Sequence, residues 1–238
     1  MTYPDDLHVV HIEQADPRLG RQIVHDPRSR GYAVSAPRSV EVKRSFRHRV
    51  FSPSPIPRQV VGNCTGCDQA IRADAQGNRQ RGVILGMDTA TKLYSRATEL
   101  DPWPGSYPPD DTGSSGLAAA KAAQEAGIIT EYRWVFGGAD QVLAVLRDRP
   151  VGVGTRWYSG MFNPEPSTLL VRPTGPVVGG HQWAIIGWNV KYGAFEALNW
   201  WGPDWGSRGL FRILKADLDA LLADDGDAHV CFRANANG

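Results

Sequence analysis

Three polar residues in apolar or glycine-rich surroundings carry the side chains needed to activate a thiol. Cys64 lies where a Pro-rich extended stretch leads into a predicted helix. A thiol at such a junction meets the positive end of the helix dipole and unpaired N–H groups, which lower its pKa. His181 opens an apolar strand, and Asn199 ends another and is followed at once by two Trp residues. In this chain order they fit the nucleophile, base and orienting amide of a thiol hydrolase.

Each of these residues also has a plainer interpretation. Cys64 and Cys67 could be ordinary cysteines at a turn, or half of a zinc site, because C-x-x-C is the commonest zinc spacing. Cys231 and the six His residues offer no second pair at ligand spacing. His181 taken alone is typical of a structural histidine, and Asn199 of a glycine-rich turn with core Trp residues. We expect neither a metal nor an organic cofactor.

Gly179 and Gly180 stand immediately before His181. Glycine in a strand marks a place where another backbone or a ligand comes close. We therefore expect a chain or a ligand to lie against the backbone here.

Two long motifs resemble those of the papain-like cysteine protease family. Gly180-His-Gln-Trp-Ala-Ile-Ile-Gly-Trp188 is similar to the family's Gly/Asn-His-Ala-Val-x-x-Val-Gly-Tyr. Asn199-Trp-Trp-Gly-Pro-Asp-Trp-Gly-Ser-Arg-Gly-Leu-Phe-Arg-Ile213 is similar to Asn-Ser-Trp-Gly-x-x-Trp-Gly-x-x-Gly-Tyr-x-Arg-Ile. The resemblance covers roughly residues 56–215. It implies an α+β fold with a helical lobe, an antiparallel, strand-rich and barrel-like lobe, and an active site in the cleft between them.

The resemblance also implies roles for individual residues. Cys64 would attack a peptide carbonyl, His181 would hold it as a thiolate–imidazolium pair, and Asn199 would orient the imidazole. Trp201 would shield that hydrogen bond from water and belong to the substrate-binding surface. The implied reaction is peptide-bond hydrolysis through an acyl-enzyme.

Counting back from Gly127 places Gly113 and Ser114 where the family has the extended segment that pairs with substrate backbone. The alternative is simple helix capping, because Ser114 or Ser115 precedes an Ala-rich run. Both can hold, since capping uses a hydroxyl and substrate pairing uses peptide groups.

The nucleophile has two candidate positions. In papain and close relatives the motif reads Gln-Gly-x-Cys-Gly-Ser-Cys-Trp, and its second Cys is the nucleophile, which indicates Cys67. Divergent bacterial and phage-encoded members resemble Asp-Gln-Gly-x-x-Gly-Ser-Cys-Thr-Gly-Asn-Ala, and Cys64 aligns directly with their nucleophile. We favour Cys64 and a phage-encoded origin, with Cys67 as the alternative nucleophile.

The oxyanion-hole Gln of the family is displaced in this chain. It stands six positions before the nucleophile, which is Arg58 for Cys64 and Val61 for Cys67. Gln59 stands one position after Arg58, the place expected if Cys64 is the nucleophile. We keep Gln59 as a candidate catalytic residue. Loss of one oxyanion donor typically costs about 10²–10³ in rate.

Two other classes of function stay open at this point. One is a papain-like structural or binding protein with weak or no turnover, for example a minor virion component. The displaced Gln, Asp68 in place of a family Trp, and Trp200 in place of Ser favour it. The other is a Cys-His amidase or transglutaminase-like acyl transferase.

The elements that must position these residues change type at Pro150. Before it, apolar residues recur at helical steps; after it, they alternate or form short runs typical of strands. The predicted helices are 89–100, 117–126, 139–146 and 216–223. The predicted strands are 151–158, 168–171, 182–188, 195–200, 209–213 and 230–232. Helices first and strands second indicate two lobes of an α+β protein.

We expect residues 1–55 to form a basic, Pro-rich N-terminal arm and 56–238 a papain-like peptidase domain. The helical lobe would span about 56–149 and the strand-rich lobe about 150–238. The basic run 42–49 predicts a solvated strand or linker, or a surface that docks on other virion proteins. The run 52–57 cannot be helical because its prolines remove donors. The arm does not match an inhibitory propeptide, so we do not expect a zymogen.

Composition limits the partners. The 238 residues carry 26 Lys and Arg against 25 Asp and Glu, a net charge of +1, which argues against a nucleic-acid binder. No apolar stretch approaches the roughly 20 residues that span a bilayer, and 1–6 shows no signal-peptide pattern. Three cysteines do not indicate a disulfide scaffold.

We expect that the protein makes no membrane contact and is synthesised in the cytoplasm. If it is phage-encoded, we expect it to be packaged into the virion. Its substrates would be peptides or proteins. Cell-wall peptides, phage structural proteins and host proteins all remain open.

Overall fold

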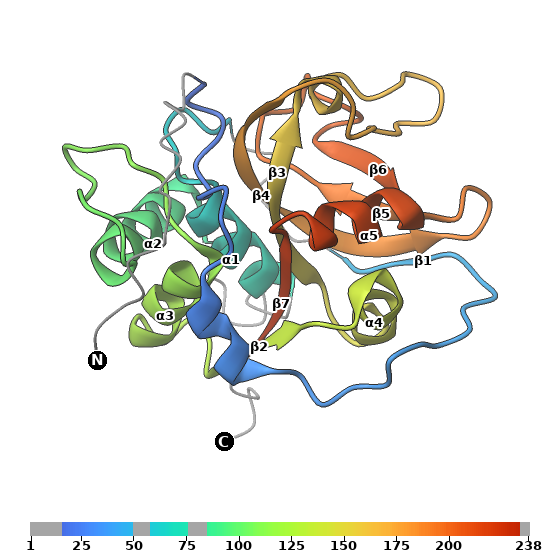
Figure 1. Ribbon diagram of the computed structural model, residues 1–238, viewed down its shortest axis with the longest axis horizontal. Helices are drawn as coiled ribbons and strands as arrows, with labels where there is room; N and C mark the ends of the chain where they lie inside the picture. The colour runs from blue at the N-terminus through green and yellow to red at the C-terminus, as the bar shows by residue number, and fades with distance from the viewer. Residues whose placement is uncertain (1–15, 50–57, 76–84, 234–238) are drawn as a thin grey trace.

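The computed structural model describes residues 16–49, 58–75 and 85–233. Figure 1 shows a group of helices on one side of the molecule and the strands, together with further helices, on the other, which is the predicted α+β architecture. Within the described residues no helix is long and apolar enough to cross a bilayer. Residues 1–6 and 52–57, on which two expectations rest, lie outside the described part.

The helical lobe consists of α1 (Cys64–Ala75), α2 (Met87–Leu100) and α3 (Gly116–Glu125). A Cβ on Gly66 would lie 2.0 Å from the carbonyl oxygen of Ala90, so only glycine allows α1 and α2 to pack this closely. Ser115 is the N-cap of α3, because its hydroxyl accepts from the Ala118 N–H. Of the two serines considered for that role, Ser115 fills it.

The strand-rich lobe is a seven-stranded sheet in which every named pairing is antiparallel. Its main path runs β2-β7-β3-β4-β5-β6, and β1 pairs with β4. The strands are β1 (Phe46–Arg47), β2 (Glu131–Val135), β3 (Val151–Tyr158), β4 (Val177–Asn189), β5 (Ala194–Leu198), β6 (Leu210–Leu214) and β7 (Asp227–Phe232). Helices α4 (Gly138–Leu146) and α5 (Lys215–Ala223) contact each other, and their apolar side chains join the core of the sheet. A short 3-10 helix, η3 (Ser159–Phe162), follows β3.

Most predicted elements are confirmed, with shifts at their ends. The four predicted helices correspond to α2, α3, α4 and α5, and five predicted strands correspond to β3, β4, β5, β6 and β7. The strand predicted over 168–171 is wrong, because this stretch forms only an isolated bridge between Leu170 and Arg212. Strand β2 went unpredicted, and it lies with α4 in the strand-rich lobe although both precede Pro150.

The described part of the arm, residues 16–49, packs against the rest of the chain. Its 3-10 helix η1 (Pro27–Tyr32) is capped by Asp26 and leads to Val34, whose N–H donates to the Trp134 carbonyl of β2. Further on, β1 joins the sheet beside β4, which confirms a strand in the basic run. Leu19 and Arg21 of the arm are only 1% and 2% exposed. Residues 16–49 are therefore part of the folded body.

Candidate active site

Cys64 is the first residue of α1, at the junction predicted from the sequence, and its side chain is 0% exposed. Burial is the dominant influence and raises the pKa of the thiol to about 12. The backbone N–H groups of Gln182, Gly20 and Thr65 act in the opposite direction and do not outweigh it. The sequence predicted a lowered pKa from the helix N-terminus. In this conformation the thiol is instead neutral, because it is fully desolvated.

His181 and Asn199 form a direct hydrogen bond between β4 and the end of β5. His181 Nε2 lies 2.8 Å from Asn199 Oδ1, and both residues are 0% exposed. Burial lowers the pKa of His181 to about 4, against the raising effect of the Asn199 hydrogen bond. The other ring nitrogen, Nδ1, is buried and has no hydrogen-bond partner within the described chain. It is thus the nitrogen left to exchange a proton.

Strand β4 brings His181 toward Cys64. The residue after His181, Gln182, directs its backbone N–H at the Cys64 thiol. Cys64 also packs in one buried apolar cluster with Ala184 and Ile186 of the same strand. Cys64 and His181, 117 positions apart in sequence, are therefore on facing elements, α1 and β4.

Trp201 lies over the His181 ring. The two ring centroids are 4.8 Å apart, and Trp157 approaches the same imidazole at 5.0 Å. Trp201 is 2% exposed, and its indole N–H donates to the Arg18 carbonyl of the arm at 3.1 Å. The indoles enclose the imidazole beside its bond to Asn199.

Cys67 lies one helical turn after Cys64 and makes different contacts. Its thiol donates to Asn63 Oδ1 at 3.7 Å and lies 3.8 Å from Met87 Sδ, against α2. Burial raises its pKa as well. Both cysteines pack in the same apolar cluster as β4, but the Gln182 and Gly20 backbones act on the pKa of Cys64 and not on that of Cys67. This difference favours Cys64 as the nucleophile.

Gln59 is buried beside the arm, whereas Arg58 is not. The Gln59 amide donates to the Val61 carbonyl at 2.9 Å and to the Pro17 carbonyl of the arm at 3.5 Å. The Arg58 side chain is 60% exposed and pairs with Asp204 at 2.8 Å. Of the two positions, Gln59 is the one with a buried amide donor, and in this conformation carbonyl oxygens of the chain itself accept from it.

The arm fills the place between the lobes where a cleft was expected. The N–H groups of Gly20 and Arg21 both donate to the Gly180 carbonyl at 3.1 Å. On the other side, Ser114 donates to the Gly20 carbonyl at 2.8 Å and accepts from the Gln22 N–H at 2.9 Å. Ser114 therefore pairs with the arm through its peptide groups, and its pairing with substrate backbone stays a prediction. We call residues 16–22 the blocking segment.

The double glycine before His181 permits this approach. A Cβ on Gly180 would lie 2.1 Å from the Arg21 carbonyl oxygen, and one on Gly179 would lie 2.7 Å from Leu19 Cδ1. The expected close approach is confirmed. Gly113, the other residue predicted to bind substrate, has φ +74° and donates its N–H to Tyr94 Oη at 2.9 Å.

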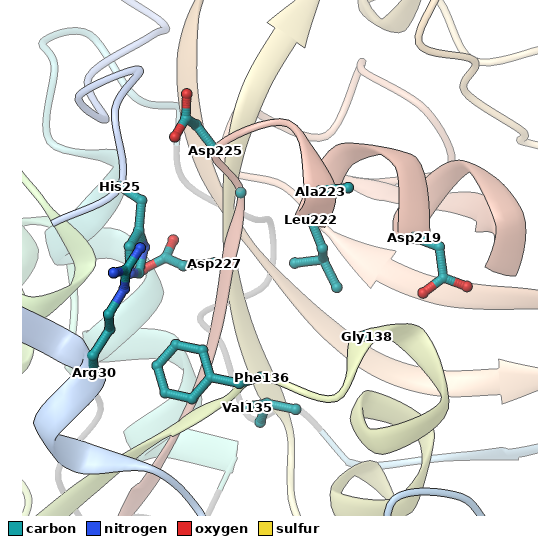
Figure 2. Close-up of a pocket in the computed structure, with 11 residues that line it drawn as sticks. His25, Arg30, Val135, Phe136, Gly138, Asp219, Leu222, Ala223, Asp225 and Asp227 are labelled. Atoms are coloured by element: carbon teal, nitrogen blue, oxygen red, sulfur yellow. The ribbon is translucent and has the colours of Figure 1, made fainter. Parts of the chain in front are cut away.

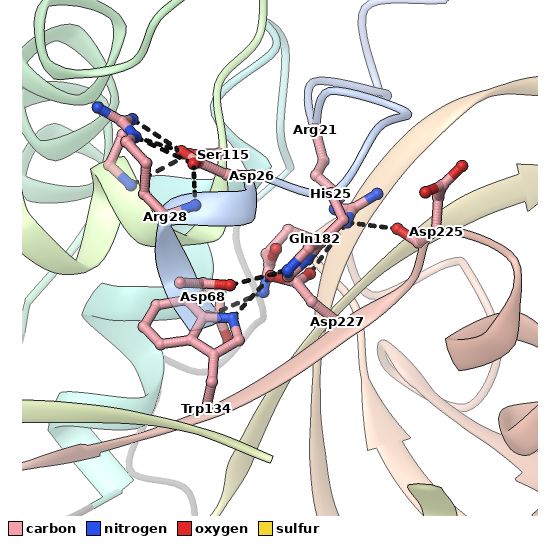
Figure 3. A network of polar contacts seen from close by, with 12 residues as sticks. Arg21, His25, Asp26, Arg28, Asp68, Ser115, Trp134, Gln182, Asp225 and Asp227 are labelled. Atoms are coloured by element: carbon pink, nitrogen blue, oxygen red, sulfur yellow. Dashed lines mark hydrogen bonds and ion pairs between the residues drawn. The ribbon is translucent and has the colours of Figure 1, made fainter. Parts of the chain in front are cut away.

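Sequence reasoning missed a buried polar network beside the blocking segment (Figure 3). Arg21 Nη2 donates to Asp227 Oδ1 at 3.0 Å and to the Asp225 carbonyl at 2.9 Å. Trp134 Nε1 donates to Asp227 Oδ2 at 2.9 Å. No spacing in the sequence connects Arg21 with Asp227, which are 206 positions apart.

Within the described residues, no three His, Cys, Asp or Glu side chains group as metal ligands do.

Parts of the chain are similar in sequence to cysteine proteinases. The chain is 39% identical to a cathepsin B-like cysteine proteinase of Schistosoma japonicum over 78 residues, which cover 32% of this chain and 22% of that protein. It is 25% identical to a gut-specific cysteine proteinase of Caenorhabditis elegans over 181 residues, covering 71% and 54%. The chain thus matches between about a fifth and about half the length of these relatives. No family model matches it.

Two solved structures have similar folds. Xylellain, a cysteine protease from Xylella fastidiosa, superposes with a TM-score of 0.74 at 15% identity over 92% of this chain and 97% of its own. ProCathepsin B S9 from Trypanosoma congolense gives a TM-score of 0.69 at 15% identity over 94% and 90%. The chain has the papain-like fold, and parts of it are similar in sequence to cysteine proteinases, cathepsin B-like ones among them.

Proposed function

We propose that this chain hydrolyses peptide bonds through an acyl-enzyme on Cys64. The observation that carries the proposal is the arrangement of His181. One ring nitrogen is held by Asn199 at 2.8 Å, and the other is left without a partner in the described chain, on the strand that faces the thiol. This is the arrangement that a base needs to take a thiol proton.

The reaction steps follow from these positions. His181 Nδ1 takes the proton from the Cys64 sulfur, and the sulfur attacks the peptide carbonyl carbon. The Gln59 amide and the Cys64 N–H stabilise the oxyanion. His181 returns the proton to the leaving amine, the C–N bond breaks, and water then hydrolyses the thioester with His181 again as the base.

Turnover requires the blocking segment to move. It lies between Ser114 and Gly180, and its Gly20 backbone is among the groups that influence the pKa of the Cys64 thiol. Removing this cover restores solvent to both groups, so the thiol pKa falls and the imidazole pKa rises toward a charged pair. We therefore propose that the described conformation is a closed one. This replaces our expectation that the arm is no inhibitory segment.

Labelling by a thiol-directed peptide electrophile identifies the nucleophile. We expect Cys64→Ala to abolish labelling and peptide cleavage, while Cys67→Ala retains both. The reverse pattern would move the nucleophile to Cys67. Steady cleavage of a generic peptide or a cell-wall stem peptide by the purified chain would exclude a purely structural role, and product analysis with added amines would separate hydrolysis from acyl transfer.

We further propose that the chain belongs to the divergent bacterial and phage-encoded branch. Two features support this: the alignment of Cys64 with that branch's motif, and the likeness in fold to the bacterial protein xylellain. A virion role is a separate prediction. Mass spectrometry of purified particles from the source would detect the chain if it is packaged.

A further inference from the structure

We infer that the interlobe site contains an acidic subsite for a guanidinium side chain, built on Asp227, and that the preferred substrates carry arginine where Arg21 now lies. This inference rests on the proposed function and names its substrate class. It draws on how the chain's own arm is held beside the thiol.

The backbone of the blocking segment shows where a bound peptide lies. Arg21 is the residue that bridges to Ser114, and its own N–H bonds to Gly180, the residue before His181. The backbone of its neighbour Gly20 acts on the pKa of the Cys64 thiol. A peptide bound in this place would pair through its backbone with Ser114 and Gly180, next to the nucleophile. Its side chain at the position of Arg21 would then enter the subsite.

The subsite is built for a cation with several donors. The Arg21 side chain is 2% exposed and that of Asp227 is 5% exposed. One guanidinium nitrogen reaches both the Asp227 carboxylate and the Asp225 carbonyl oxygen. Trp134 Nε1 holds the second carboxylate oxygen and so fixes the orientation of Asp227. The acceptors for a guanidinium thus come from β7 and the turn before it.

Gly154 of β3 provides the space for the side chain. A Cβ at this position would lie 2.3 Å from Arg21 Nε and 2.5 Å from Asp227 Oδ1. Gly154 pairs with Asp227 across the sheet, so its missing side chain leaves room beside the carboxylate. Any other residue at 154 would fill the subsite.

The charge near the subsite favours the same occupant. A cavity of about 500 Å³ opens beside Asp227 (Figure 2). Its basic lining residues, His25 and Arg30, belong to the arm, and its acidic ones, Asp219, Asp225 and Asp227, belong to the strand-rich lobe. Asp225 is paired with Arg156, which leaves Asp227 as the buried carboxylate that faces the arm.

Withdrawal of the arm removes the cation that Asp227 now faces, Arg21 at 3.0 Å, together with the His25 imidazole 3.8 Å away. The hydrogen bond from Trp134 stays in place. A buried carboxylate left without a cation is costly, so a substrate that brings its own guanidinium is bound in preference to a neutral one.

The test uses the full-length chain with Arg21→Ala, which empties the subsite. The probes are peptidyl electrophiles that carry arginine, or its uncharged isostere citrulline, at each of three positions before the reactive group. We expect Cys64 to be labelled about 10- to 100-fold faster with arginine at one position. Adding Asp227→Asn should remove this preference. Gly154→Ala in the same background fills the subsite while keeping the carboxylate, and should remove it too.

A binding measurement separates this inference from the proposed function. N-acetyl-arginine amide should raise the Tm of Arg21→Ala and leave that of Arg21→Ala/Asp227→Asn unchanged. Equal labelling by arginine and citrulline probes at every position would overturn the subsite and leave Asp227 as an anchor for the arm alone, even if peptides are cleaved. Arginine-selective binding without cleavage of any peptide would overturn the hydrolase and leave the subsite standing.

Discussion

The molecule contains two buried arginine–aspartate pairs with similar chemistry and different consequences. Arg72 pairs with Asp68 at 2.7 Å, with exposures of 1% and 0%, and Arg21 pairs with Asp227 at 3.0 Å, with exposures of 2% and 5%. The first pair lies within one helix, α1, four positions apart. The second joins the arm to β7. Unfolding must break the first, whereas movement of the arm is enough to break the second.

Further contacts of Arg72 connect the lobes. Its guanidinium lies 2.6 Å from His229 Nε2 and donates to Cys231 Sγ at 3.3 Å, both on β7. Gln182 of β4 donates to Asp68 at 3.3 Å. This pair therefore fixes the helical lobe to the sheet, and the Arg21 pair holds a segment that must leave for substrate to enter. Burial alone does not distinguish a structural ion pair from a releasable one. What distinguishes them is whether both partners lie on the same helix or on two segments that can move apart.

The largest expected loss of stability comes from breaking the Asp68–Arg72 pair. Asp68→Asn leaves Arg72 buried without its carboxylate, and we expect the free energy of unfolding to fall by about 3–5 kcal/mol in urea titrations. The double variant Asp68→Leu/Arg72→Met removes both charges and should lose much less. A single variant as stable as the parent would contradict the role of this pair.

Asp227→Asn should cost less, because Arg21 can follow the arm into water instead of staying buried unpaired. We expect a loss of about 1–3 kcal/mol and faster labelling of Cys64 by a small neutral thiol reagent at fixed pH. Arg30→Gln, an exposed arginine of the same arm, is the matched control and should change neither quantity. Unchanged labelling in Asp227→Asn would mean that this pair does not hold the arm.

Acidification tests both pairs, because each has a neighbouring imidazole. Burial is the leading influence that lowers the pKa of His25, beside Asp227, and of His229, beside Asp68. His181, under the arm, has a pKa lowered to about 4. The closed state thus favours neutral imidazoles. This contribution is complete above pH 6.5 and is lost as pH falls through the folded-state pKa values.

We expect hydrogen exchange to report this loss first in the arm. Protection of the Gly20, Arg21 and Gln22 amides, corrected for intrinsic rates, should fall below pH 6.5, about tenfold for each unit of pKa difference. The amides of α1 should keep their protection to lower pH. Simultaneous loss in both places would show that the arm and the lobe interface form one cooperative unit.

The smallest effect should come from an exposed pair. Arg58 and Asp204 lie 2.8 Å apart with side-chain exposures of 60% and 81%. Asp204→Asn should leave the free energy of unfolding within about 0.5 kcal/mol and peptide cleavage unchanged. A large loss of cleavage on Arg58→Gln would reopen Arg58 as the oxyanion donor in place of Gln59.

Local patterns predicted much of the fold. The helical spacing of Ala90, Leu93, Tyr94 and Ala97 corresponds to the buried side of α2, and β3 has the bounds expected from its apolar run. The prediction of a strand over 168–171 was wrong, because a short apolar run becomes a strand only where a partner strand is available. Strand β2 was missed for the converse reason, since its pairing with β7 comes from about 100 residues further along the chain.

For the candidate site, the sequence supplied the residue types and their order. It predicted that Cys64, His181 and Asn199 act together and that a chain or a ligand approaches Gly179 and Gly180. In the structure Asn199 bonds to His181, and the arm lies on the glycines. The identity of that chain as residues 16–22 was not predictable, because nothing in the arm's composition specifies which surface it covers.

The sequence by itself determined which groups carry the chemistry: a thiol at a helix start, an imidazole on a strand and an amide before two indoles. These depend on local residue order, which does not change when distant parts of the chain move. Only the tertiary structure decided their state. Whether the Cys64 thiol is charged, and whether Asp227 holds Arg21 or a substrate, depends on desolvation and on partners brought from far along the chain.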